Sequence, residues 1–134
     1  MIFAVIDTNV IVSSFITEND DAATARVIRA IADGKIIPLY NEEIIEEYRD
    51  VLSRPRFGFD IEAVLKTIDM IVLAGIDLES EHWPELLPDE DDRVFFEVAL
   101  AGQDEDAKLV TGNIKHYPRV DFVVTPAQIM SLIS

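Results

Sequence analysis

The chain has no cysteine, which excludes disulfide bonds, thiolate nucleophiles and zinc sites with thiolate ligands. Its two histidines, His82 and His116, do not stand in a metal-binding spacing such as HxxxH, so we expect no histidine-based zinc site. The motifs GxSxG, GxGxxG and DxDxT and the phosphate-binding loop are absent as well. These absences argue against serine hydrolases, nucleotide-binding enzymes and haloacid-type phosphatases.

No hydrophobic run is long enough to cross a membrane. The first apolar segment is interrupted by Asp7 and has no basic leader, and the run Met70–Gly75 is far too short for a bilayer. We therefore expect a cytoplasmic protein with neither a signal peptide nor a membrane segment. The lack of cysteine is compatible with a reducing compartment.

Positive charge is scarce, since 11 Lys and Arg residues stand against 26 Asp and Glu residues and give a net charge of -15. A field of this sign repels phosphate backbones, so simple electrostatic binding to nucleic acid is disfavoured. Carboxylates gathered around bound cations reverse the local sign. The charge thus leaves three interpretations open: a metal-dependent nuclease, a protein with a basic partner, or a solvated acidic surface.

Hydrophobic residues make up 49% of the 134 positions, which is enough for one domain (1–134) with a sizeable core. Strands are expected at residues 2–6, 36–40, 75–78, 109–111 and 122–124, and helices at 10–15, 22–32, 42–52, 61–73, 92–101 and from Pro126 onward. Short apolar strands separated by helices predict an α/β fold with a parallel sheet covered on both faces.

Asp7 directly follows the first expected strand, at the edge of the sheet where sites gather in such folds. A buried charge there needs a partner or a chemical role. We expect Thr8 or Asn9 to cap the following helix, and an acid near a helix start such as Asp7 is itself a capping candidate. The sequence alone leaves Asp7 open between a helix cap and a ligand.

Two further segments contain acids next to apolar faces. On the helix expected at 42–52, Glu47 lies at the margin of the apolar stripe, whereas the other acids point mostly toward solvent. On the helix expected at 92–101, Arg93 and Glu97 fall outside the buried arc. Asp91 and Asp92 both fall on its buried side, so periodicity cannot choose between them, and either also favours a helix N-terminus through the dipole.

Asn113 follows the strand expected at 109–111. Its amide oxygen would serve as a neutral ligand or hold a water, and an ordinary turn after Gly112 is the alternative.

Four segments in order resemble the PIN-domain family of metal-dependent ribonucleases, and most closely its branch described as toxin components of toxin–antitoxin systems. They are IDTN, EEYRDVLSRPRF, DEDDRVFFEVALA and VTGNIKHYP. The resemblance implies a three-layer α/β/α fold with a central, mostly parallel sheet. It also implies an Mg²⁺ or Mn²⁺ site formed by Asp7, Glu47 and Asp92.

In that family, the third acid stands at the start of a helix and is followed seven residues later by an alanine. Asp92 and Ala99 have this spacing, so the resemblance selects Asp92 over Asp91 and leaves Asp89 as an outer participant. Asn113 stands where many relatives have a fourth acid, and we include it in the catalytic set.

Other side chains gain expected roles from their nearness to these motifs. Thr8, Asn9 and Thr111 are expected to hold the carboxylates in place by hydrogen bonds. Phosphate contacts with RNA are expected from Arg49, Arg54, Arg93 and Lys115.

The resulting hypothesis is a metal-dependent endoribonuclease that hydrolyses RNA phosphodiester bonds, acts as a toxin and is restrained by an antitoxin protein. Its alternative is a PIN-like binding or scaffold module with weak or no catalysis, which Asn113 in place of an acid would permit. A structure-specific DNA nuclease is a third hypothesis, although such enzymes usually carry extra helical segments. The resemblance also raises the expectation of a homodimer, but the sequence shows no exposed apolar stripe for it.

Overall fold

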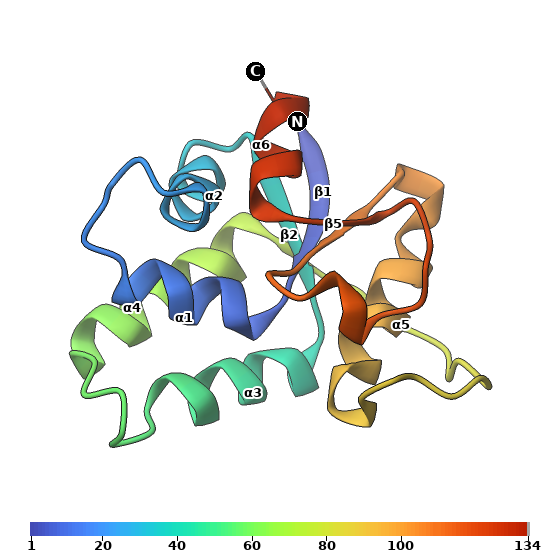
Figure 1. Cartoon of the computed structure of the whole chain (residues 1–134), viewed down its shortest axis with the longest axis horizontal. Helices are drawn as coiled ribbons and strands as arrows, with labels where there is room; N and C mark the ends of the chain where they lie inside the picture. Colours follow the sequence, from blue (N-terminus) through green and yellow to red (C-terminus); the bar gives the residue numbers. More distant parts are fainter. Residues whose placement is uncertain (134) are drawn as a thin grey trace.

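A five-stranded sheet lies at the centre of the computed structural model, which describes residues 1–133 (Figure 1). Its strands are β1 (Ile2–Ile6), β2 (Ile36–Tyr40), β3 (Ile76–Asp77), β4 (Lys108–Val110) and β5 (Val123–Val124), in the spatial order β3-β2-β1-β4-β5. Every pairing is parallel. The strand order reverses between β1 and β4, and this switch point is where sites form in open α/β sheets.

Six α-helices cover the sheet. They are α1 (Thr8–Ile16), α2 (Ala23–Ala32), α3 (Glu42–Leu52), α4 (Ile61–Ala74), α5 (Arg93–Ala101) and α6 (Pro126–Ile133), with short 3₁₀ turns η1 (Glu90–Asp92), η2 (Gln103–Glu105) and η3 (Ile114–His116). Helix α5 packs on β1, β2 and β4, whereas α2, α4 and α6 lie on the other side (Figure 1). The predicted three-layer α/β/α fold with a parallel sheet is confirmed.

The central strand is apolar throughout because both of its faces are covered. Ala4, Val5 and Ile6 are completely buried, as expected for a parallel strand between two helical layers. Asn41 caps α3 through its side chain, as the sequence pattern indicates. No helix among residues 1–133 combines the length and the hydrophobicity that a membrane span requires.

Several predicted boundaries need correction. The helix expected at 10–15 begins at Thr8, so its N-cap is Asp7 rather than Thr8 or Asn9. The backbone of Asp7 is extended, and its side chain accepts a hydrogen bond from the Asn9 amide, which is the usual geometry of a cap. The strand expected at 109–111 ends at Val110, which leaves Thr111 in the loop beyond the sheet edge.

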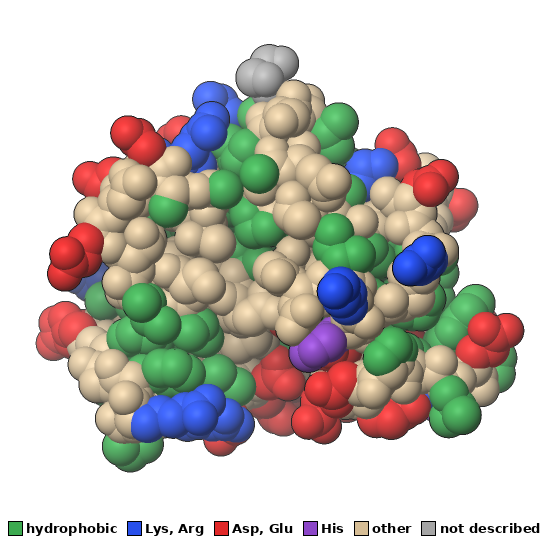
Figure 2. Space-filling view, in the orientation of Figure 1, with side chains coloured by type: hydrophobic (Ala, Val, Ile, Leu, Met, Phe, Trp, Pro, Cys, Tyr) green, Lys and Arg blue, Asp and Glu red, His purple; other side chains and the backbone are tan. Residues whose placement is uncertain are grey.

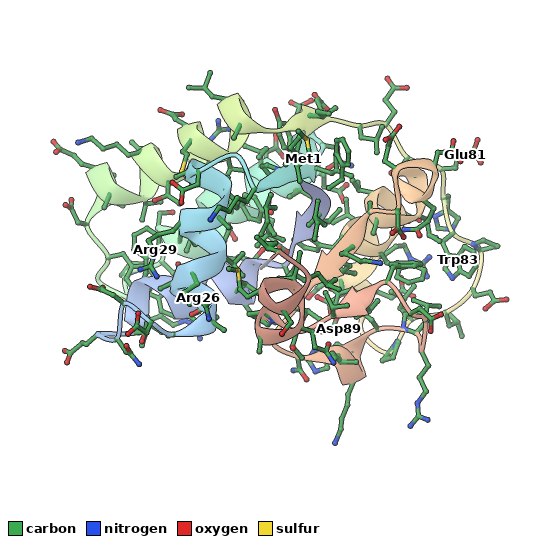
Figure 3. All side chains as sticks on the ribbon, turned by 90° about the horizontal axis from the view of Figure 1, so that it is seen from above. Met1, Arg26, Arg29, Glu81, Trp83 and Asp89 are labelled. Carbon is green, nitrogen blue, oxygen red and sulfur yellow. The ribbon has the colours of Figure 1, made fainter. Side chains whose placement is uncertain are left out.

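The expectation that Arg93 and Glu97 lie outside the buried part of their helix is wrong. Their side chains are only 16% and 13% exposed, because the segment before α5 folds back over them. Glu97 accepts a hydrogen bond from the backbone of Trp83, and Arg93 donates to the carbonyls of Trp83 and Glu85. Figure 3 labels Trp83 on this outer segment and Asp89 nearer the middle of the molecule.

Tyr48 fixes α3 against the end of the central strand. Its side chain is fully buried, and its hydroxyl donates a hydrogen bond of 2.5 Å to the carbonyl of Ile6. Its ring lies 6.3 Å from that of Phe95 on α5. Tyr48 thus connects α3 and α5 to Ile6, the residue that precedes Asp7.

We predict that Tyr48→Phe lowers the free energy of unfolding by about 1–3 kcal/mol, because it leaves the buried Ile6 carbonyl without its donor. Urea unfolding followed by circular dichroism measures this loss. The matched variant Tyr40→Phe removes a hydrogen bond to the partly buried Val72 carbonyl and should cost less. Equal losses in the two variants would contradict the special weight given to Tyr48.

Candidate active site

Asp7 is the most buried acid of the site, with 5% of its surface exposed. Its Oδ2 accepts hydrogen bonds from the hydroxyls of Thr111, at 2.9 Å, and Tyr117, at 2.8 Å. Burial raises the pKa of Asp7, and the two hydroxyl bonds lower it in part. Asp7 caps α1 with Oδ1, whereas Oδ2 is held by donors from the loop after β4, so its role as a cap does not exclude a role as a ligand.

The first turn of α1 and the loop that follows β4 are held together by side-chain hydrogen bonds. The amide oxygen of Asn9 accepts from the Gly112 backbone at 3.1 Å, and its amide nitrogen lies 3.4 Å from the Thr111 hydroxyl. The backbone of Asn113 donates to the same hydroxyl at 3.0 Å. Asn9 and Thr111 therefore fix this loop against the start of α1, beside Asp7.

Glu47 reaches the site from α3 and is half-buried. The Thr8 hydroxyl donates to its Oε2 at 2.5 Å, which ties α3 to the first turn of α1. Burial raises the pKa of Glu47, and the charges of Asp7 and Asp91 add to the rise. Glu47 and Asp7 thus belong to one electrostatic site.

Asp92 comes from η1, opposite the loop after β4. Its Oδ2 is buried, and within residues 1–133 it has no hydrogen-bond donor. Burial, followed by the charges of Asp7 and Asp89, raises the pKa of Asp92 to about 7. Asp91, which the pattern could not separate from Asp92, is exposed.

The arrangement fits a divalent cation. The three carboxylates act on one another, and burial raises the pKa of each. A buried anionic oxygen without a donor, such as Asp92 Oδ2, is costly unless a positive charge lies beside it. Carboxylate oxygens are the ligands that Mg²⁺ and Mn²⁺ prefer. Among the described residues, the potential ligand atoms that lie within 4.8 Å of one another are those of Asp89, Asp92 and His116, and the charges of Asp7 and Glu47 act on Asp92.

An acidic cleft of about 450 Å³ opens beside these residues, between α3 and the segment that includes η1 and α5. Its lining consists of Glu43, Glu47, His82, Glu90, Asp91, Arg93, Val94 and Glu97. Figure 2 shows red acidic side chains at the lower edge of the molecule, where Figure 1 draws α3 and α5. The cleft gives a ligand access from solvent to Glu47.

The cations expected to contact phosphate are placed differently from one another. Arg49 and Lys115 are exposed, and Arg54 forms an exposed ion pair with Asp50 at 3.1 Å. Arg93 binds Glu90 with distances of 2.5 and 2.8 Å besides its two carbonyl contacts. Its guanidinium therefore holds the segment before α5, a role that the sequence did not indicate.

Sequence reasoning missed Tyr117 and the placement of His116. Both lie in the loop after β4, where no helix or strand periodicity predicts orientation. Tyr117 is 3% exposed, and burial next to the Asp7 charge raises its pKa far above the ordinary range, so it remains a hydrogen-bond donor. His116 faces Asp92, and Asn113 turns its amide toward the His116 ring. The only sequence signal was a histidine and a tyrosine soon after a strand end.

Comparison with known proteins identifies one family. Residues 4–115 match the sequence model of a family described as PIN domain, which covers most of the chain. Neither the curated proteins nor the solved structures compared with the chain include a significant match.

We predict that the metal-free protein loses stability as the pH rises from about 4 to about 7. Asp92 has a folded-state pKa of about 7 against an ordinary value of 3.8, so the folded state binds a proton that the unfolded state releases in this window. Urea unfolding in a chelator at about pH 5 and about pH 8 measures the loss.

Asp92→Asn should show a clearly smaller loss than the wild type, whereas the exposed neighbour variant Asp91→Asn removes only one of the charges that act on Glu47 and should lose nearly as much as the wild type. An unchanged pH dependence in Asp92→Asn would contradict the raised pKa.

Proposed function

Because the chain belongs to the PIN-domain family, we propose that it is a metal-dependent endoribonuclease that hydrolyses RNA phosphodiester bonds. PIN domains are in general nucleases, and RNA as the substrate is our proposal. The observation that carries it is the buried Asp92 Oδ2, which lacks a donor and lies within the field of the Asp7 and Glu47 charges. Without a cation, this concentration of carboxylates would repel a phosphate.

Asp7, Asp92 and Glu47 would hold Mg²⁺ or Mn²⁺. When bound, such an ion lowers the pKa of a water molecule and offsets charge on the phosphate. Tyr117 and Thr111 hold Oδ2 of Asp7 in a fixed direction. Glu47 stands at the cleft, fixed by Thr8, and is placed to orient the attacking water. Arg49 and Lys115, both exposed, are the cations that we propose for phosphate contacts.

We propose two protein partners in addition to RNA. As a toxin acting in the cytoplasm, the chain would be restrained by an antitoxin that lays a basic segment over the acidic cleft. The net charge of -15 and the acidic lining support a cationic partner. A second copy would pack on α4, where Ile61, Leu65 and Leu73 are exposed, a surface that the sequence pattern did not indicate.

The alternative function is a binding or scaffold module. Position 113 holds an asparagine where many PIN domains have a fourth acid, so the site has three central acids. The side chain of Asn113 is exposed and lies 3.0 Å from His116. This observation favours weak metal binding over efficient catalysis. Activity and metal binding of the wild type distinguish the two functions.

We predict that Asp7→Asn abolishes metal-dependent cleavage of single-stranded RNA, with a loss of at least about 100-fold. Asparagine is as good an N-cap as aspartate, but its single oxygen cannot both cap α1 and accept from Tyr117 and Thr111, so some stability should be lost while removal of the buried charge offsets part of that loss. Cleavage with Mn²⁺ or Mg²⁺ is followed on gels, metal binding by calorimetry and the fold by circular dichroism.

Asp50→Asn, an exposed change on α3, serves as the control and should cleave like the wild type. If the wild type cleaves none of a varied set of RNAs and binds no metal, the module is the correct function.

We predict that Tyr117→Phe weakens metal binding by about 10–100-fold, because Asp7 loses the donor that orients its Oδ2. Calorimetric titration with Mn²⁺ measures the affinity. Tyr40→Phe removes a tyrosine hydroxyl that bonds to Val72 instead, and it should leave the affinity unchanged. Equal affinities in wild type and Tyr117→Phe would show that Tyr117 has only a packing role.

A further inference from the structure

His116 lies beside the one buried carboxylate oxygen that has no hydrogen-bond donor within residues 1–133. Its Nδ1 is 3.5 Å from Asp92 Oδ2. This separation is longer than a good hydrogen bond. Adjacent ligand atoms of one octahedral ion, each about 2.1 Å from it, lie about 3 Å apart. A shift of about half an ångström would bring both atoms to the separation of two ligands of one ion, and in the structure the Asp92 oxygen still lacks a donor.

Asp89 completes the cluster from the other end of η1. One ligand atom from each of Asp89, Asp92 and His116 lies within 4.8 Å of the others. Asp89 and Asp92 are partly buried, whereas the His116 side chain is 46% exposed. Two carboxylates and one imidazole thus lie close enough together to share one ion, and the charge of Asp7 acts on Asp92.

Asn113 contacts the nitrogen of His116 that points away from Asp92. Its side-chain Nδ2 lies 3.0 Å from Nε2 of the ring. Turning the amide by 180° puts its oxygen in the same place, where it accepts the proton of Nε2 and leaves the lone pair of Nδ1 for a metal ion beside Asp92. The backbone N–H of Asn113 donates a hydrogen bond of 3.0 Å to the Thr111 hydroxyl, which fixes the backbone that carries the side-chain amide. Asn113 would then act as a positioning residue for the imidazole.

We propose that His116 supplies a nitrogen ligand, together with Asp92 and Asp89, to the divalent cation of this site, and that the site therefore favours Mn²⁺ over Mg²⁺. The proposal rests on the metal dependence proposed above. Mg²⁺ takes oxygen ligands almost exclusively, whereas imidazole binds transition metals well. The nitrogen ligand thus adds affinity for Mn²⁺ that it cannot add for Mg²⁺.

The test uses the full chain without added histidines, loaded with Mn²⁺. Pulsed electron paramagnetic resonance detects the coupling of a ¹⁴N nucleus to bound Mn²⁺, which is independent of any activity. The chain has only two histidines, so His116→Gln and its matched control His82→Gln account for every imidazole. His82 is exposed and lies 3.3 Å from Glu97 rather than at Asp92.

We expect ¹⁴N coupling in the wild type and in His82→Gln, and its loss in His116→Gln. Calorimetry should show Mn²⁺ affinity falling by about 10-fold or more in His116→Gln. Mg²⁺ affinity should change little, so that the preference for Mn²⁺ shrinks.

Bound Mn²⁺ without ¹⁴N coupling in the wild type would overturn the proposal, as would coupling that persists in His116→Gln. In both cases, RNA cleavage that depends on Asp7 would leave the ribonuclease function standing. A wild type that binds neither metal would overturn both proposals together.

Discussion

The buried carboxylate of Asp7 is the constraint on which the rest of the site depends. A charge at the end of a completely buried strand is costly, and this chain compensates with donors from distant segments. Thr111 and Tyr117 both come from the loop after β4, more than a hundred residues later. The hydrogen bonds that offset the cost of burying Asp7 therefore also fix the path of that loop, and with it the positions of Asn113 and His116.

The sheet topology explains why these segments meet. The strand order reverses between β1 and β4, so the chain leaves these neighbours in different directions and opens a space between α3 and η1. Glu47 and Asp91 line this space from its two sides, and Asp92 follows Asp91 in η1. Because burial, together with the charges of neighbouring carboxylates, raises the pKa values of Glu47 and Asp92, the acidic character of the site costs stability until a cation is present. Because a bound cation reverses the local sign of the charge, a net charge of -15 is compatible with the anionic substrate that we propose.

The sequence predicted the parts of the site that follow regular periodicity. Asp7 was recognisable because it ends an apolar strand, and Glu47 because it lies at the margin of a helical stripe. Asp92 was separable from Asp91 only by family resemblance. The physical reason is that both acids lie in η1, a 3₁₀ turn in which side chains repeat every three residues. A helical wheel drawn with 3.6 residues per turn therefore misplaces the side chains that precede Arg93. Arg93 and Glu97 were misplaced because a loop covers them, which no helical wheel includes.

The loop after β4 changes how the asparagine in TGN is understood. As a replacement for an acid, Asn113 only removes a charge from the site, which favours a weaker nuclease or a binding module. Its amide lies against the imidazole of His116, and that imidazole faces the Asp92 oxygen that lacks a donor. A carboxylate at position 113 would add a fifth negative charge to Asp7, Glu47, Asp89 and Asp92, whereas a neutral amide orients the imidazole without that repulsion. The substitution therefore replaces charge with a nitrogen ligand rather than simply weakening the site.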